Sequence, residues 1–139
     1  MPPARTISAY MTPGPITVPR STTMAKALRL MEEHGFRHLP VIEGDRLCGM
    51  ISERELRVVE NMRGIDSAFC TVGDFILGPP YAVGPETPVR EVARVMMERK
   101  IGSAAVVEGD QVIGLFTTTD ALRVLCDALD HEERAGGRA

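Results

Sequence analysis

The chain has no tryptophan, and aromatic residues make up only 4% of its 139 residues. No uninterrupted apolar run approaches the roughly 18 residues that a membrane span needs, and the N-terminal stretch lacks the apolar segment of a signal peptide. We therefore expect no membrane partner and a cytoplasmic location. With 44% hydrophobic residues, the chain is long enough to bury the core of an ordinary globular domain, which excludes a disordered or fibrous protein.

Neither sign of charge dominates the sequence. The 16 Lys and Arg residues nearly balance the 19 Asp and Glu residues, which leaves a formal net charge of −3. There is no dense basic cluster interleaved with aromatic residues, the pattern that marks many nucleic-acid interfaces. We therefore expect no nucleic-acid partner.

Cysteine is scarce, and its three residues show no CxxC spacing. An odd count without close pairs disfavours a disulfide framework and a structural zinc site, so we expect reduced thiols. Asp127, Asp130 and His131 stand at helical spacing, but a charged helix end is the simpler interpretation, and we expect no metal site. The cysteines are Cys48, Cys70 and Cys126.

Residue sets that are typical of catalysis are missing as well. The sequence shows no Ser-His-Asp or Cys-His arrangement and no phosphate-binding loop with a catalytic lysine. It therefore predicts a protein that is not an enzyme and needs no obligatory cofactor.

The chain aligns with itself at a constant offset of 65 residues, without a gap. Because this register persists from one end of each unit to the other, it indicates a duplication. We expect a first repeat at 6–59, a linker at 60–70, a second repeat at 71–128 and a disordered tail at 129–139. Identical pairs include Thr6/Thr71, Pro15/Pro80, Met31/Met96, Val41/Val106 and Gly49/Gly114.

Each unit predicts the element order β-α-β-β-α, an α+β fold. The first helix has apolar residues at i, i+3, i+4 and i+7, an N-cap expected at Thr22 and an end at Gly35. Its counterpart has an expected cap at Thr87 and a first-turn proline at Pro88. Two apolar runs around a Glu-Gly-Asp turn then predict a hairpin. The expected strands are 16–18, 39–42 and 47–51, then 81–83, 104–107 and 112–116, and the second helices are 53–60 and 118–128.

The two units resemble a tandem pair of CBS domains, or Bateman module, from Thr6 to about Ala128. The resemblance implies two repeats related by a pseudo-twofold axis, with clefts that hold adenosine compounds such as AMP, ADP, ATP or S-adenosylmethionine. It also implies a homodimer. The residues that carry it are Met11-Thr12, Ile16-Thr17-Val18, Leu39-Pro40-Val41-Ile42, Gly49-Met50-Ile51-Ser52 and Glu55, then Ala105-Val106-Val107, Gly114-Leu115-Phe116-Thr117 and Asp120.

The segment after Gly114 has the chemistry of an anion and ribose site. Thr117, Thr119 and Asp120 lie where a strand passes into a helix, and the first helical N–H groups favour a phosphate. The Asp120 carboxylate can accept hydrogen bonds from two vicinal ribose hydroxyls, each contributing about 1.5–3 kcal/mol. The alternative is that Thr117 and Asp120 only cap the helix.

The first unit departs from this pattern at Glu55, whose carboxylate reaches about 1.5 Å further than that of an aspartate. Ser52 keeps the hydroxyl, and Arg54 is expected to pair either with a phosphate or with Glu55. We expect a second, weaker site here, formed by Ser52, Arg54, Glu55 and Thr17, and one nucleotide per chain rather than two.

By the same resemblance, Arg37 and His38 are expected to meet the phosphates of a nucleotide anchored on Asp120. The second unit has Gly102 and Ser103 instead, so the positive charge comes from one side; the alternative is a solvated strand end. The adenine is expected against Tyr81, Ala82, Ile101 and Ala104.

The leading hypothesis is a non-catalytic sensor in which an adenosine nucleotide shifts the angle between the repeats, and an effector protein or dimer mate reads the change. The alternative is a ligand-independent module that dimerises and supports a separate enzyme or transporter.

Overall fold

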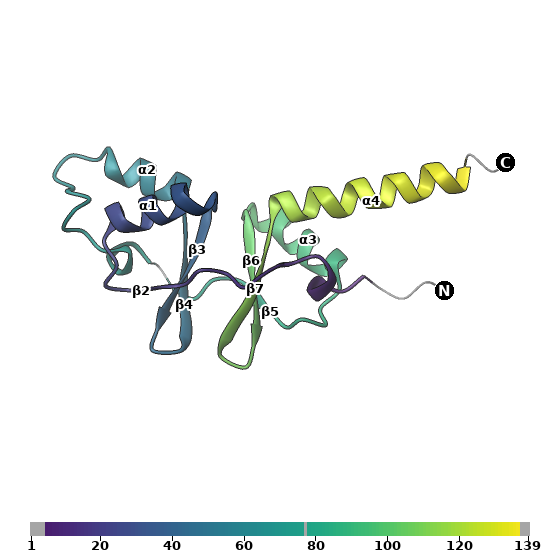
Figure 1. Ribbon diagram of the computed structural model, residues 1–139, viewed down its shortest axis with the longest axis horizontal. Coiled ribbons are helices and arrows are strands. Elements are labelled where there is room, and N and C mark those ends of the chain that lie inside the picture. The colour runs from purple at the N-terminus through teal and green to yellow at the C-terminus, as the bar shows by residue number, and fades with distance from the viewer. Residues whose placement is uncertain (1–4, 77, 137–139) are drawn as a thin grey trace.

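The computed structural model describes residues 5–76 and 78–136, which form two similar halves side by side (Figure 1). In the first half, strands β2 (Val18–Pro19), β3 (His38–Glu43) and β4 (Arg46–Ser52) form one sheet in the order β2-β3-β4. Strand β2 is parallel to β3, and β3 is antiparallel to β4. Helices α1 (Met24–His34) and α2 (Glu53–Glu60) lie on the outer side of this sheet.

The second half repeats this arrangement with β5 (Ala82–Val83), α3 (Val89–Arg99), β6 (Ser103–Glu108), β7 (Gln111–Thr117) and α4 (Thr118–Gly136). A further short strand, β1 (Thr12–Pro13), pairs with β7, which gives the sheet order β1-β7-β6-β5. The two sheets meet at the centre of the molecule (Figure 1). The predicted α+β fold and the order β-α-β-β-α in each unit are confirmed.

The offset of 65 residues is also a structural repeat. Helix α3 begins and ends 65 positions after α1, and the same holds for β6 relative to β3 and for β7 relative to β4. Both hairpins shift register at equivalent places, between Val41 and Ile42 and between Val106 and Val107. Equivalent residues of the two repeats therefore occupy equivalent positions.

The N-caps of the first helices differ from the prediction by one residue. Thr23, not Thr22, caps α1, because its hydroxyl oxygen accepts a hydrogen bond from the backbone N–H of Lys26 at 3.2 Å. Thr22 is buried in the preceding turn, where its N–H donates to the carbonyl of Pro19. In the second repeat Pro88 occupies the N-cap position, without a side-chain cap, so the predicted cap at Thr87 is also wrong.

Helix α4 is longer than the sequence predicted. It continues to Gly136, so residues 129–136 of the expected disordered tail are helical, and only residues 137–139 lie outside the described residues. This stretch has no proline and contains good helix formers such as Glu132, Glu133 and Arg134. Asp130 and Arg134 also stand at the i, i+4 spacing that supports a helix.

The first segment of each repeat packs into the core of the other repeat. Ile7, in the short helix η1 (Ile7–Ala9), is fully buried in the core of the second half with Val89, Val92 and Phe116. Its N–H donates to the carbonyl of Thr87 at 2.8 Å. The chain then crosses the centre to reach the first half (Figure 1). The repeat boundaries read from the sequence did not predict this exchange.

The equivalent segment of the second unit crosses in the opposite direction. Val72, in η2 (Val72–Phe75), is fully buried in the core of the first half, and its N–H donates to the carbonyl of Thr22 at 2.8 Å. Gly49 and Gly114 let the crossing segments approach the central strands. A Cβ on Gly49 would lie 2.7 Å from the side chain of Ile76, and one on Gly114 would collide with Met11 and lie 3.1 Å from the carbonyl oxygen of Thr12.

Across 5–76 and 78–136, the helices fall short of the length and apolar character required for a bilayer crossing.

If the exchange of segments holds the halves together, Ile7→Ala should lower the free energy of unfolding by about 2–5 kcal/mol, because it leaves a cavity in the second core. Urea titration followed by circular dichroism measures this change. The control is Val58→Ala, at a side chain that is 56% exposed, which should change stability by less than about 0.5 kcal/mol. An Ile7→Ala chain as stable as the wild type would show that the N-terminal segment is not docked.

Candidate ligand clefts between the two repeats

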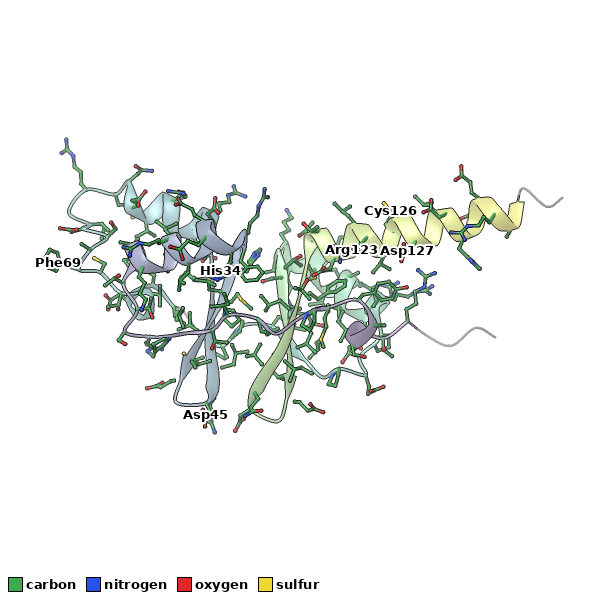
Figure 2. The ribbon with its side chains drawn as sticks, in the orientation of Figure 1. His34, Asp45, Phe69, Arg123, Cys126 and Asp127 are labelled. Atoms are coloured by element: carbon green, nitrogen blue, oxygen red, sulfur yellow. The ribbon has the colours of Figure 1, made fainter. Side chains whose placement is uncertain are left out.

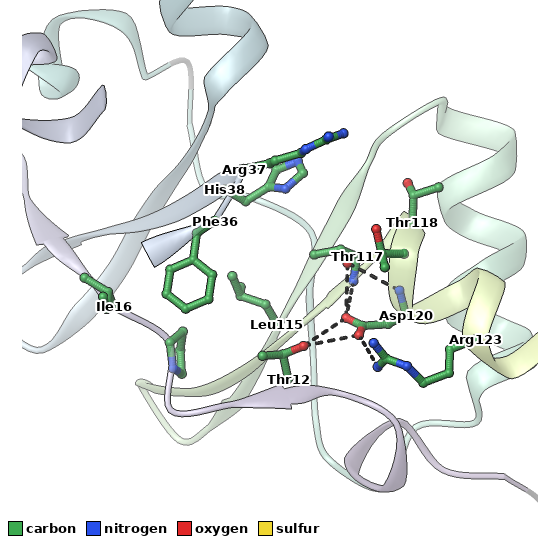
Figure 3. A pocket seen from close by; sticks show the side chains of 13 residues that line it. Thr12, Ile16, Phe36, Arg37, His38, Leu115, Thr117, Thr118, Asp120 and Arg123 are labelled. Atoms are coloured by element: carbon green, nitrogen blue, oxygen red, sulfur yellow. Dashed lines mark hydrogen bonds and ion pairs between the residues drawn. The ribbon is translucent and has the colours of Figure 1, made fainter. Parts of the chain in front are cut away.

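Two clefts lie between the halves. The first, here called the Asp120 cleft, has a volume of about 440 Å³. Figure 3 shows apolar side chains of Ile16, Phe36 and Leu115 on one side of it and Asp120 with Arg123 on the other. Its lining residues are Thr12, Pro15, Ile16, Gly35, Phe36, Arg37, His38, Leu115, Thr117, Thr118, Thr119, Asp120 and Arg123.

The second, here called the Glu55 cleft, has a volume of about 670 Å³. Apart from Arg37 and His38, which line both clefts, its residues are the equivalents of those in the Asp120 cleft at the offset of 65. Each cleft is therefore composite, with a strand end and helix start from one repeat and apolar residues from the other. The remaining lining residues are Met50, Ser52, Glu53, Arg54, Glu55, Pro80, Tyr81, Lys100, Ile101, Gly102 and Ser103.

The structure corrects the expected adenine slot. Tyr81 and Ile101 line the Glu55 cleft rather than the Asp120 cleft, whereas Ile16 and Phe36 take the equivalent positions beside Asp120. The prediction drew the apolar residues from the same repeat as Asp120, but the crossing segments bring them from the opposite repeat. The remaining two residues line neither cleft, since Ala104 is fully buried in the second core and Ala82 is exposed on β5.

Asp120 is a buried carboxylate, only 2% exposed, at the start of α4. Oδ2 accepts hydrogen bonds from the backbone N–H of Thr117 at 2.9 Å and from its hydroxyl at 3.2 Å. Oδ1 accepts from the hydroxyl of Thr12 at 3.2 Å and from Nη1 of Arg123 at 3.0 Å. The helix cap that we left open as the alternative is therefore present, and the same carboxylate also lines the cleft.

Other groups surround the Asp120 cleft with donors and positive charge. Thr118 and Thr119 lie exposed in the first turn of α4, at a helix N-terminus, whose dipole favours an anion. The N–H of Thr118 already donates to the carbonyl of Gly102 at 3.1 Å. Arg37 is exposed at the start of β3, on the opposite repeat (Figure 3). The structure thus brings Thr117, Thr119, Asp120, Arg37 and His38 into one cleft, as the sequence predicted.

The Glu55 cleft is organised more loosely. Glu55 is exposed, and its carboxylate accepts one hydrogen bond, from the hydroxyl of Ser52 at 2.8 Å, among the contacts of the described residues. Arg54 is exposed as well. Ser52, Arg54 and Glu55 line this cleft together, but Thr17, the fourth residue of the expected second site, lines neither cleft.

The family model of the CBS domain matches the chain twice, over residues 7–60 and 72–127. The chain belongs to the CBS domain family. The tandem CBS pair that the sequence resembles is thereby confirmed.

Known proteins align with most of this CBS pair. It is 37% identical over 106 residues to an inosine-5'-monophosphate dehydrogenase of Korarchaeum cryptofilum. The aligned region covers 76% of this chain but only 21% of the dehydrogenase. A Vibrio cholerae protein described as the acetoin utilization protein AcuB has a TM-score of 0.81 at 26% identity, over 95% of this chain and 98% of that one. The structure of CBSX2 in complex with AMP has a TM-score of 0.76 at 28% identity, over 88% and 97% of the two chains.

The lining residues of the Asp120 cleft that the sequence analysis did not place in the site include Thr12, Ile16, Phe36 and Arg123. The offset of 65 contained a signal for two of them, because Ile16 and Phe36 are the equivalents of Tyr81 and Ile101. Arg123 stands three residues after Asp120, the spacing of neighbours on one helix face. Thr12 reaches Asp120 only through the pairing of β1 with β7, which no local pattern indicates.

His38 lies half-buried between the two clefts of the CBS pair. Burial lowers the pKa of its imidazole below the ordinary value of 6.5; the Glu55 carboxylate opposes this shift and the Arg37 guanidinium adds to it. The imidazole is therefore mainly neutral at pH 7, and Arg37 is the main source of positive charge from the first repeat.

We expect His38 to make the CBS pair less stable in mild acid. The unfolded chain takes up a proton near pH 6.5 but the folded chain only at lower pH, so the free energy of unfolding should fall as the pH drops through this window. One proton contributes at most about 1.4 kcal/mol per pH unit. Urea titrations between pH 5 and 7.5 should show a flatter dependence for His38→Gln. Identical pH profiles for both chains would contradict this expectation.

Proposed function

We propose that this CBS pair is a regulatory, non-catalytic module that binds an adenosine nucleotide in the Asp120 cleft. The observation that carries the proposal is the position of one buried carboxylate, at the N-terminus of a long helix, opposite apolar side chains of the other repeat. The similarity to CBSX2, whose structure is a complex with AMP, supports the same ligand class.

Each part of an adenosine nucleotide has a matching part in this cleft. The apolar side chains of Ile16 and Phe36 suit the faces of a base, since pockets for small molecules are mainly apolar. The Asp120 carboxylate suits the vicinal hydroxyls of a ribose, and the first turn of α4 suits a phosphate. Arg37 adds a cation from the opposite repeat. The same reasoning admits AMP, ADP, ATP or S-adenosylmethionine, all of which carry the adenosine group.

Regulation would follow from the composite cleft. A ligand in the Asp120 cleft touches β3 of one repeat and α4 of the other, so it stabilises the relative arrangement of the halves that fits it best. A homodimer mate or a separate effector protein would read this arrangement.

Isothermal titration with AMP, ADP, ATP and S-adenosylmethionine tests the proposal. We expect at least one to bind with one ligand per chain, because only the Asp120 cleft pairs a buried carboxylate with a long helix. Asp120→Ala should weaken binding roughly 100-fold, since it removes two charge-assisted hydrogen bonds. Glu55→Ala is the matched control and should leave this affinity unchanged.

Folding of the Asp120→Ala chain is checked by its urea transition, because the same carboxylate caps α4. If none of the four compounds binds the wild-type chain, the proposal that the Asp120 cleft binds an adenosine nucleotide is wrong. Loss of binding in Glu55→Ala instead would place the ligand in the other cleft.

The second candidate function is a ligand-independent dimerisation or scaffold module, and α4 favours it. Leu122, Leu125 and Leu129 are each more than half exposed at i, i+3 and i+7, and they form an apolar stripe that no element of residues 5–76 and 78–136 covers. Most of α4 extends beyond the sheets, as the positions of Cys126 and Asp127 in Figure 2 show. A second copy of the chain could cover this stripe, which would make the protein a homodimer.

If α4 forms the homodimer interface, Leu125→Glu should convert the protein to a monomer, because a charge would be buried without a partner. Sedimentation velocity measures the change in mass. Phe69→Glu is the control, at an 81% exposed side chain at the far end of the molecule from α4 (Figure 2), and should keep the wild-type mass. A dimer that persists in Leu125→Glu would exclude α4 as the interface. A dimer that binds none of the nucleotides would favour the scaffold function.

A further inference from the structure

The Asp120 cleft carries a contact that competes with the ligand proposed for it. Both oxygens of the carboxylate are already hydrogen-bonded within the chain, and the side chain is 2% exposed. The backbone N–H and hydroxyl of Thr117, which belong to the helix cap, donate to Oδ2, and Nη1 of Arg123 donates to Oδ1. The hydroxyl of Thr12 lies 3.2 Å from Oδ1 and 3.4 Å from Oδ2, so Oδ1 is its nearer acceptor.

The partners of Oδ1 are the ones that a ligand can displace. Arg123 is 59% exposed on its own side chain and lines the cleft, so its guanidinium can turn into solvent. The ion pair with Asp120 joins this exposed guanidinium to a buried carboxylate, so the guanidinium remains in contact with water when the pair opens. Thr12 needs only a rotation of its hydroxyl or side chain to release Oδ1. Thr117 is tied to the cap through its backbone and is not released as easily.

This arrangement is confined to one of the two clefts. The equivalent of Arg123 in the first repeat is Val58, which has no donor, and Glu55 is exposed rather than saturated with internal hydrogen bonds. The duplication therefore does not explain Arg123. A purely structural cap would need Thr117 alone, as Ser52 alone caps α2 in the first repeat.

We propose that Arg123 and Thr12 form a latch on Asp120: they occupy Oδ1 while the cleft is empty, and the vicinal hydroxyls of a nucleoside must displace them to bind. The proposal rests on the function proposed above. The latch lowers the affinity for every ligand that binds through a diol, and it makes the state of Arg123 and of the β1 segment differ between the empty and the occupied cleft. Ligands without the diol gain nothing from its removal.

A neutral nucleoside has no phosphate, so its binding tests the competition for Asp120 without any attraction between Arg123 and a phosphate. Arg123→Gln and Thr12→Val should each tighten the binding of adenosine about fivefold, because each removes one internal donor that contributes about 1 kcal/mol. Thr12→Val changes no charge, so an effect shared by both variants cannot come from electrostatic attraction. For 2′,3′-dideoxyadenosine, which lacks both hydroxyls, neither variant should change the affinity. Isothermal titration measures all affinities.

Arg46→Gln is the control, because this substitution removes the same charge as Arg123→Gln. Arg46 is exposed at the hairpin of the first repeat and lies outside both clefts. The Arg46→Gln chain should bind adenosine as the wild type does. If the wild-type chain binds adenosine or AMP but neither latch variant binds adenosine more tightly, the latch is overturned and the proposed function stands. Equal tightening for dideoxyadenosine would also overturn it. If no variant and no wild-type chain binds any adenosine compound, both proposals fail.

Discussion

The rest of this CBS pair depends on an exchange between the halves, in which the first segment of each repeat, Ile7–Ala9 or Val72–Phe75, packs into the other repeat. Ile7 is buried in the core of the second repeat and Val72 in the core of the first, so neither core is complete without the other unit. A repeat of this size is only marginally stable by itself, and the exchange gives each core a side chain from the other repeat. It also draws the chain across the centre, where Gly49 and Gly114 admit the crossing segments beside β4 and β7.

The same crossing makes both clefts composite. The helix start with its carboxylate comes from one repeat and the apolar residues come from the other, so any ligand in a cleft contacts both halves. The two repeats share an element order but carry different chemistry. Asp120 is buried and saturated with donors, whereas Glu55 is exposed, and Arg37 and His38 supply both clefts because the second repeat has Gly102 and Ser103 in their place. Duplication supplied two clefts, and side-chain divergence made them unequal.

Much of the site was predictable because its signals are local. The passage from β7 into α4 placed Thr117, Thr119 and Asp120 together, and the basic pair before β3 placed Arg37 and His38. Tyr81 and Ile101, which we expected beside Asp120, line the other cleft, because an apolar residue does not indicate which repeat it will face. The tail after Ala128 was predicted to be disordered, although its residues favour a helix that continues the preceding turn.

The amino-acid sequence by itself determined the duplication, the order of the elements and the approximate places of most helices and strands, because periodicity and turns depend on residues close together in the chain. The tertiary structure decided which repeat's apolar residues face each carboxylate and which donors reach Asp120. Those contacts join Thr12 and Ile16 to residues a hundred positions or so away, and they exist only because burying Ile7 and Val72 in opposite cores fixes the path of the chain between the halves.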